Sequence, residues 1–180
     1  NPYTFLHIIN PDYKNTIKNN GIEKYKLVKE KYQEFIDNNY LFQDKMPSYY
    51  IYQQQNTSHT FKGIIAATSV EDYINGKIKK HEHTITAREE MFKDYLYTTG
   101  FNADPVLLSY PKNIAIETLL FKYEKQRAEY EFTTTNKSLH KLWVINDVND
   151  ITIITEEFSK IESFYIADGH HRCASSSLLT

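Results

Sequence analysis

Cysteine is nearly absent from this sequence, which excludes the functions that need several thiols. The 180 residues contain a single cysteine, Cys173. One thiol cannot close an internal disulfide, so a disulfide-stapled scaffold is excluded, and so is a zinc ribbon built on four cysteines. This cysteine usage fits a reducing compartment.

Long apolar runs and an excess of one charge are also missing. No uninterrupted apolar stretch approaches the ~18 residues of a transmembrane helix, and the first residues lack the basic and apolar regions of a signal peptide. Lys and Arg number 21 against 23 Asp and Glu, so the chain lacks the basic field of nonspecific nucleic-acid or membrane binders. We expect a soluble, cytoplasmic protein without membrane or nucleic-acid partners, in which any nucleotide contact is local.

The length and composition predict one folded domain. A chain of 180 residues is one domain's worth of sequence, and 41% hydrophobic with 14% aromatic residues is enough for a packed core. The first residue is not Met, and the segment after Ala174 resembles a helix cut short. We therefore expect residues 1–180 to form a single domain of a longer protein.

Apolar periodicity predicts alternating strands and helices. Strand composition marks residues 5–9, 49–52, 59–67, 105–110, 129–134, 139–145 and 164–167, with a hairpin connection at 53–58. Three- and four-residue spacing marks helices at residues 22–38, 69–75, 86–99, 116–123 and 174–179. Capping signals lie at Ser69 and Thr86, Gly100 is a stop signal, and residues 77–85 are expected to be a loop. The predicted fold is α/β, with a mixed α+β sheet.

The residues that could carry chemistry fall into two compact histidine groups. His81-Glu82-His83 lies in the predicted loop, and Asp168-Gly169-His170-His171-Arg172 lies between a predicted strand and a predicted helix. A helix start offers unpaired N–H groups and the positive end of its dipole, and glycine permits a sharp turn and close approach. The second group therefore predicts a phosphate cradle. Its expected members are Gly169, His170, His171 and Arg172.

Asp168 needs a separate explanation because it would repel a bare phosphate. Its expected tasks are to hold a histidine in one tautomer, to coordinate Mg²⁺ or to assist proton transfer. A purely structural alternative has Asp168 capping the helix while Gly169 serves only the turn. For residues 81–83 the alternative is a solvated loop that continues the lysine-rich residues 77–80.

A transition-metal site is a further alternative. His-x-His with a carboxylate and a second histidine pair could supply three or four ligands. Adjacent residues point in different directions, so at most one of His170 and His171 would face a site shared with His81 or His83. On this ground the residues predict no stoichiometric zinc or iron. Cys173 is either a thiol whose pKa the helix dipole lowers, or a small semi-buried residue facing the strand.

Four segments together resemble a widespread prokaryotic family of domains of unknown function. They are Asn1-Pro2-Tyr3-Thr4-Phe5-Leu6-His7, Ser69-Val70-Glu71-Asp72-Tyr73, His81-Glu82-His83-Thr84 and Ala167-Asp168-Gly169-His170-His171-Arg172. The resemblance covers nearly all of residues 1–180, and the family includes the ADP-dependent free-serine kinase. It implies a ParB/sulfiredoxin-like nucleotide-binding fold whose Gly-x-x-Arg turn receives nucleotide phosphates. Sulfinic-acid repair is not expected, because sulfiredoxins have cysteine where this chain has His170.

The resemblance implies a small-molecule kinase. Such an enzyme would use Mg²⁺ and transfer a phosphoryl group from ADP or ATP to free L-serine. The cradle residues would hold the donor phosphate. The expected catalytic residues are Asp168, Glu82, His81 and His83, of which Asp168 or Glu82 would take the proton of the acceptor hydroxyl. Two other classes stay open: a ParB-like nucleotide-binding regulatory module without turnover, and a histidine-based metal-dependent enzyme.

Overall fold

The computed structural model describes residues 2–15 and 19–180, and the chain divides into two compact units. The first unit contains residues 1–43, 69–109 and 163–180, and the second contains residues 44–68 and 110–162. Two compact units can belong to one folding domain, so the single domain expected from the length stays a prediction.

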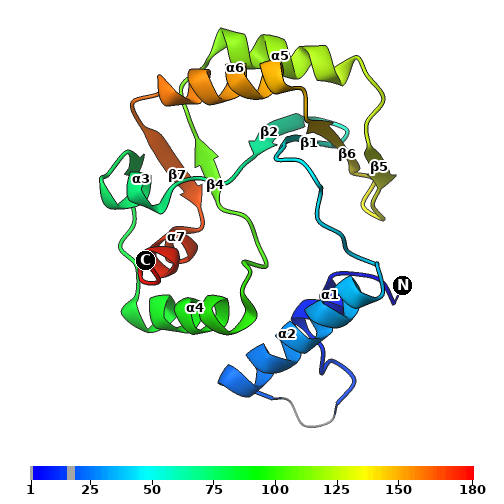
Figure 1. The fold of residues 1–180 in the computed structure, drawn as a ribbon, viewed down its shortest axis with the longest axis vertical. Coiled ribbons are helices and arrows are strands. Elements are labelled where there is room, and N and C mark those ends of the chain that lie inside the picture. Colours follow the sequence, from blue (N-terminus) through cyan, green and yellow to red (C-terminus); the bar gives the residue numbers. More distant parts are fainter. Residues whose placement is uncertain (1, 16–18) are drawn as a thin grey trace. The chain divides into compact units, whose positions relative to one another are not determined.

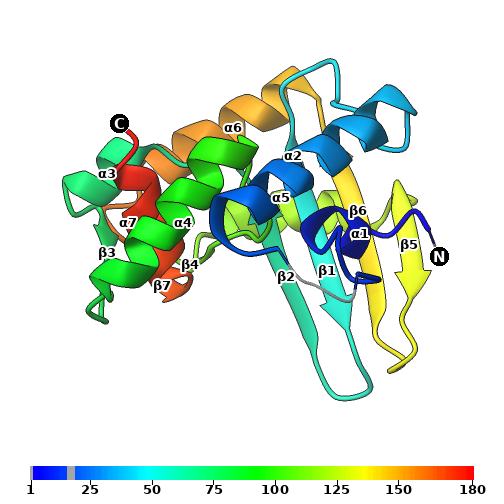
Figure 2. The same ribbon diagram turned by 90° about the horizontal axis from the view of Figure 1, so that it is seen from below.

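The first unit holds a three-stranded sheet in the order β3-β7-β4. β3 (Ile78–Lys79) pairs parallel with β7 (Phe164–Asp168), and β4 (Leu107–Ser109) pairs antiparallel with β7. Helix α7 (His170–Ser177) follows β7 and lies against α3 (Val70–Ile74) and α4 (Thr86–Thr99), as Figure 1 and Figure 2 show. The core between these elements is formed by Tyr73, Ile78, Ile166 and Ala174.

The strand predicted at residues 5–9 is wrong, because Leu6–Ile9 form helix α1. The amide of Ile8 donates to the carbonyl of Phe5 at 2.9 Å, so this short run satisfies its backbone locally instead of in a sheet. Ile8 is fully buried in a cluster with Val28 and Phe35 of α2 (Gly21–Asp37), the helix predicted at 22–38. A run of five residues, four of them apolar, carries too little periodicity to separate helix from strand, and packing on α2 decides the outcome.

The loop predicted at residues 77–85 is also partly wrong, since it contains β3. A two-residue strand exists only through its pairing with β7, which lies more than 80 residues away in the sequence. Thr86 is the first residue of α4 and not its cap, because Ile85 occupies the N-cap position without a side-chain hydrogen bond. The hydroxyl of Thr84 donates to the Glu89 carboxylate instead.

The second unit is a four-stranded antiparallel sheet with two helices. The strand order is β2-β1-β6-β5, formed by β1 (Tyr49–Gln55), β2 (Thr60–Ile65), β5 (Tyr130–Thr133) and β6 (Leu139–Ile145). The predicted hairpin is confirmed, although β1 continues through Gln55 and shortens the connection. α5 (Ile114–Glu124) and α6 (Val148–Ser159) lie side by side (Figure 1), and the sequence patterns did not predict α6.

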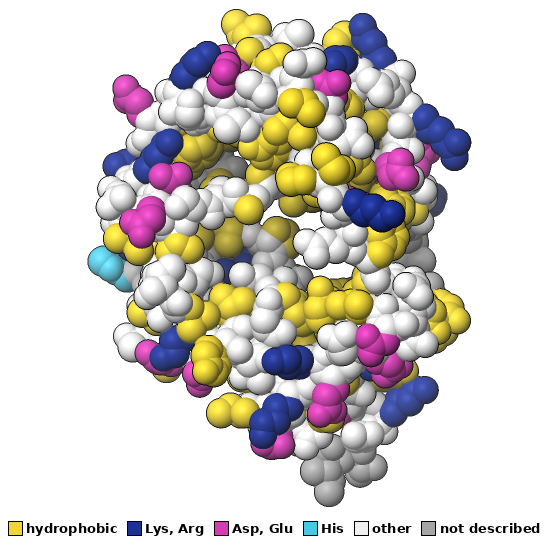
Figure 3. All heavy atoms as spheres, in the orientation of Figure 1, with side chains coloured by type: hydrophobic (Ala, Val, Ile, Leu, Met, Phe, Trp, Pro, Cys, Tyr) yellow, Lys and Arg dark blue, Asp and Glu magenta, His cyan; other side chains and the backbone are white. Residues whose placement is uncertain are grey.

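The mixed α/β class expected from the sequence is confirmed. Ser69 caps α3 as predicted by accepting from the Glu71 amide at 3.1 Å, and Gly100 ends α4 in the left-handed conformation. Among the described residues, no helix has both the length and the apolar character needed to cross a membrane. On the face shown in Figure 3, Lys and Arg are interspersed with Asp and Glu, in keeping with the near-balanced charge.

Asp150 forms a buried polar cluster in the second unit. The residue is 5% exposed, and its side chain accepts hydrogen bonds from Lys122 Nζ at 2.6 Å and the Tyr123 hydroxyl at 2.7 Å. Burial by itself raises the pKa of the Asp150 carboxyl, but the bonds from Lys122 and Tyr123 outweigh it and hold this pKa below its ordinary value. The ionised carboxylate therefore stabilises the contact between α5 and α6.

We expect Asp150→Asn to lower the free energy of unfolding at pH 7 by about 1–2 kcal/mol. The effect is no larger because Lys122 is half-exposed, so solvent screens its ion pair with Asp150. A lowered folded-state pKa contributes stability above the ordinary carboxyl pKa and loses it as the pH falls through the folded-state value. Urea unfolding from pH 7 to pH 3 should thus show a shallower acid-side decline in the variant. Glu156→Gln on the exposed face of α6 is the control. It should change neither the free energy of unfolding at pH 7 nor its decline toward pH 3.

Candidate functional site

The turn between β7 and α7 is built around Gly169. Its φ of 100° lies in the left-handed region that L side chains rarely adopt, so the chain reverses here without strain only with glycine. A Cβ at this position would lie 3.1 Å from both Arg172 Nη2 and Val106 Cγ2. The missing side chain therefore gives Arg172 room to lie across the turn. The sharp turn predicted from the sequence is confirmed.

Helix α7 starts directly at His170 without a side-chain cap. The first N–H groups of a helix have no hydrogen-bond partner within it. In α7 the Cys173 amide donates the first helical hydrogen bond, to Gly169 O at 3.0 Å. The alternative in which Asp168 caps the helix is wrong, because its carboxylate accepts from Arg172 Nη2 at 2.7 Å instead. No side chain therefore caps the positive end of the α7 dipole.

The ion pair between Asp168 and Arg172 joins the two ends of the turn. The Asp168 side chain is 73% exposed, whereas that of Arg172 is only 20% exposed. Because the contact uses Arg172 Nη2, Asp168 binds the arginine and not a histidine, so the role of holding a histidine tautomer is not the one seen here. The pairing orients the guanidinium across Gly169.

Three consecutive residues each place a buried polar atom without a hydrogen-bond partner at this turn. The atoms are His170 Nε2, His171 Nδ1 and Arg172 Nε. A buried polar atom that lacks a partner costs roughly 1–3 kcal/mol, so such a group in a native protein calls for a ligand or water. All three residues belong to the first turn of α7, where an acceptor-rich ligand could meet those polar atoms that turn toward it.

The two adjacent histidines face different neighbours, as their spacing predicts. The His171 ring stacks on Phe92 of α4, with 6.5 Å between centroids and 17° between planes. The His170 ring meets His81 edge-on, with centroids 4.4 Å apart. The helix that carries Phe92 was predicted at residues 86–99, but no signal in the sequence indicated its histidine partner. His171 therefore links α7 to α4, while His170 reaches the loop after β3.

Parallel pairing of β3 with β7 brings the two histidine groups together. Ile78 pairs with Phe164 and Lys79 with Tyr165, so the segments that follow both strands leave the sheet at the same edge. His81 and Glu82 follow β3, and His170 follows β7. His170 Nδ1 lies 3.7 Å from Glu82 Oε2, and His81 Nε2 lies 3.8 Å from Glu82 Oε1.

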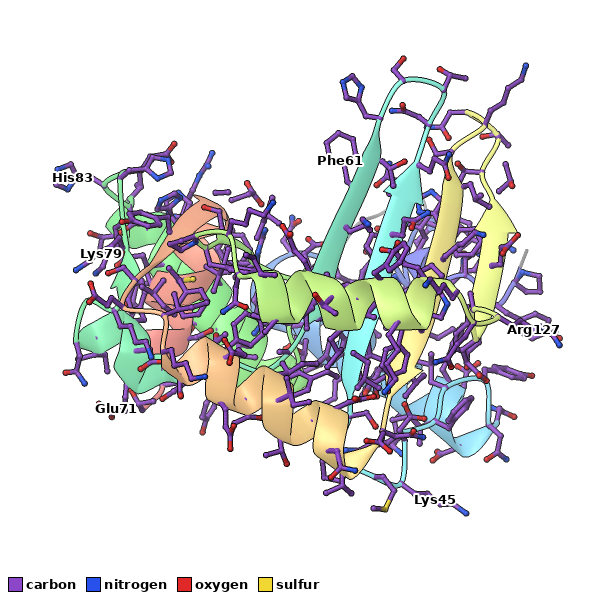
Figure 4. All side chains as sticks on the ribbon, turned by 90° about the horizontal axis from the view of Figure 1, so that it is seen from above. Lys45, Phe61, Glu71, Lys79, His83 and Arg127 are labelled. Carbon is purple, nitrogen blue, oxygen red and sulfur yellow. The ribbon has the colours of Figure 1, made fainter. Side chains whose placement is uncertain are left out.

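His83 lies outside this group although it belongs to the same motif. It is exposed, and Figure 4 shows it pointing outward from the loop, beyond Lys79. The ammonium group of Lys80 lies over the Tyr73 ring, 4.1 Å from its centroid. The loop is thus partly solvated, as the structural alternative held, while His81 and Glu82 meet His170. A catalytic role for His83 stays a prediction.

Cys173 is a packing residue and not an activated thiol. It is half-buried against the core of Tyr73, Ile78, Ile166 and Ala174. Burial raises the pKa of this thiol above its ordinary value, although the positive charges of Arg172 and Lys80 act in the opposite direction. The alternative in which the helix dipole lowers this pKa is wrong, because desolvation dominates.

Comparison with known proteins assigns the chain to a family. Residues 1–180 match the model of a protein family of unknown function, DUF1015, and the chain belongs to this family. No curated protein and no solved structure matches the chain.

Proposed function

We propose that this member of the DUF1015 family is a nucleotide-binding small-molecule kinase that transfers a phosphoryl group from ADP or ATP to free L-serine. The observation that carries the proposal is the group of three buried polar atoms without partners, His170 Nε2, His171 Nδ1 and Arg172 Nε, at the start of α7. A nucleotide phosphate at the start of α7 would supply acceptor oxygens to these atoms once their side chains turn toward it. The identities of the donor and of the acceptor rest on the resemblance to the serine kinase family.

The phosphate would lie over Gly169 at the positive end of α7. The Arg172 guanidinium lies against Gly169 and would face the phosphate, and α7 begins without a side-chain cap on its first amides. Arg172 would divide its guanidinium between two anions, with Nη2 on Asp168 and Nε on the phosphate. Bound Mg²⁺ would neutralise charge on the phosphate oxygens. A ParB/sulfiredoxin-like fold and a cytoplasmic location belong to the same proposal.

Asp168 would take the proton of the acceptor hydroxyl. Its carboxylate is highly exposed beside the turn, whereas Glu82 lies within 4 Å of two histidine rings. In the transfer, the serine oxygen forms a bond to the terminal phosphorus as the bond to the bridging oxygen breaks. The hydroxyl proton passes to Asp168, and the donor nucleotide leaves one phosphate shorter.

The decisive assay follows O-phosphoserine formation by the complete gene product with Mg²⁺ and either ADP or ATP. We expect product with one of these donors and none when serine is omitted. Nucleotide binding is measured separately by calorimetry. If the protein binds nucleotide yet phosphorylates neither serine nor any other small hydroxyl compound, the kinase proposal fails and a ParB-like regulatory module replaces it.

Arg172→Ala is expected to weaken ADP binding by about ten- to a hundredfold. A hydrogen bond to a charged group is worth roughly 1.5–3 kcal/mol, and the variant removes the guanidinium from the buried side of the turn. Isothermal titration calorimetry with ADP and Mg²⁺ measures the change. Arg127→Ala is the matched control, because Arg127 is exposed in the second unit (Figure 4). Unchanged affinity in a folded Arg172→Ala protein would remove the turn from the nucleotide site.

A further inference from the structure

We infer that His81, Glu82 and His170 form a binding site for one divalent transition-metal ion of the zinc class. The potential ligand atoms of these three side chains all lie within 4.8 Å of one another. Two imidazole nitrogens and one carboxylate oxygen are the donor set of three-ligand zinc sites, which leave a further position for water. The inference rests on this geometry and not on the proposed phosphoryl transfer, although His170 belongs to both sites.

The three side chains need to move only a little for their ligand atoms to coordinate one ion. Ligands at ~2.0–2.2 Å from zinc lie roughly 3–3.5 Å from each other in a tetrahedral arrangement. The Glu82 oxygens already lie 3.7 Å from His170 Nδ1 and 3.8 Å from His81 Nε2. His81 and Glu82 are 57% and 65% exposed, so their side chains have space to turn toward the ion.

His170 is the preorganised ligand of the three. Its side chain is only 7% exposed, and it stands at the first position of α7, directly after the sheet. Nδ1 is the ring nitrogen that faces Glu82, whereas Nε2 is buried without a hydrogen-bond partner. A neutral imidazole that ligates through one nitrogen carries its proton on the other. Metal binding at Nδ1 would therefore fix the tautomer in which Nε2 donates to a ligand at the turn.

The sequence-based prediction of no zinc rested on the adjacent pair His170 and His171. The structure removes this objection for that pair, because only His170 joins the cluster and His171 stacks on Phe92. His81 and Glu82 are also adjacent, but the loop after β3 brings His81 Nε2 to 3.8 Å from Glu82 Oε1. The second histidine comes from the loop after β3, which parallel pairing with β7 places at the same sheet edge. Two motifs about ninety residues apart thus supply one ligand set.

The test titrates the complete, chelator-treated protein with Co²⁺ and Zn²⁺ in the absence of nucleotide. We expect one equivalent of Co²⁺ with a visible d–d absorption band that Zn²⁺ displaces. His81→Ala and Glu82→Gln alter exposed side chains and should keep the fold, and each is expected to weaken Zn²⁺ binding at least about tenfold. His170→Ala should abolish the band. His83→Ala, in the same loop but outside the cluster, is the matched control and should bind as the parent protein does.

Absence of a d–d band in the parent protein, or unchanged Zn²⁺ affinity in both His81→Ala and Glu82→Gln, would overturn the site. Equal loss in the His83→Ala control would assign binding to a surface histidine instead and overturn it as well. ADP binding and serine phosphorylation are separate readouts. A failed kinase assay therefore leaves the metal site standing, and a failed metal titration leaves the kinase proposal standing.

Discussion

Asp168→Asn is expected to lower kcat for serine phosphorylation by about a hundred- to ten-thousandfold, the usual range for a general base. The substitution keeps the shape of the side chain but removes the carboxylate that would take the hydroxyl proton. ADP affinity should stay equal or rise, because the change removes a negative charge beside the phosphate site and releases Arg172 from its 2.7 Å contact. Steady-state kinetics of O-phosphoserine formation, with calorimetry for ADP, measure both quantities.

The two carboxylates near the turn are distinguished by paired variants. A large loss of kcat in Glu82→Gln together with normal turnover in Asp168→Asn would transfer the role of base to Glu82. A change in ADP affinity without a change in kcat would remove Asp168 from the chemistry. Asp94→Asn, on an exposed position of α4, controls for the loss of one surface charge.

Ile166→Ala is expected to lower the free energy of unfolding by about 2–5 kcal/mol. Ile166 is 1% exposed at the centre of β7, where it packs with Tyr73, Ile78 and Ala174. Truncation removes buried methyl groups and leaves a cavity between the sheet and α7, and both terms destabilise the fold. Urea unfolding followed by circular dichroism measures the difference.

Tyr165→Ala provides the matched control for Ile166. The two residues are adjacent on β7, but successive side chains of a strand point to opposite faces, and Tyr165 is 51% exposed. Tyr165→Ala should lower the free energy of unfolding by about 1 kcal/mol or less. Equal losses in the two variants would show that the β7 face toward α7 is not the core of the first unit.

Much of the fold could be predicted because its signals are local. The amphipathic spacing at 22–38, the polar connection after Tyr52 and the stop at Gly100 correspond to α2, the β1-β2 hairpin and the end of α4. α6 was not predicted. A local signal for this helix was present but not used, because its N-cap is Asp147, whose side chain accepts from the amides of Asn149 and Asp150.

The predictions that were wrong concern residues whose structure depends on contacts with segments far away in the sequence. Residues 5–9 have strand composition, yet burial of Ile8 against α2 makes them helical. Cys173 lies where a helix dipole could activate it, yet desolvation in the core raises its pKa. In both cases the surroundings outweigh the local preference, and those surroundings come from other segments of the chain.

The sequence by itself determined the turn at residues 168–172, because a strand, a glycine and a helix start are neighbours along the chain and their geometry follows from short-range sterics. Only the tertiary structure decided which side chains meet there. It paired Arg172 with Asp168, and it brought His81 and Glu82 to His170 through a two-residue strand. So short a strand has no stability without its partner, and no local pattern in the sequence predicts it.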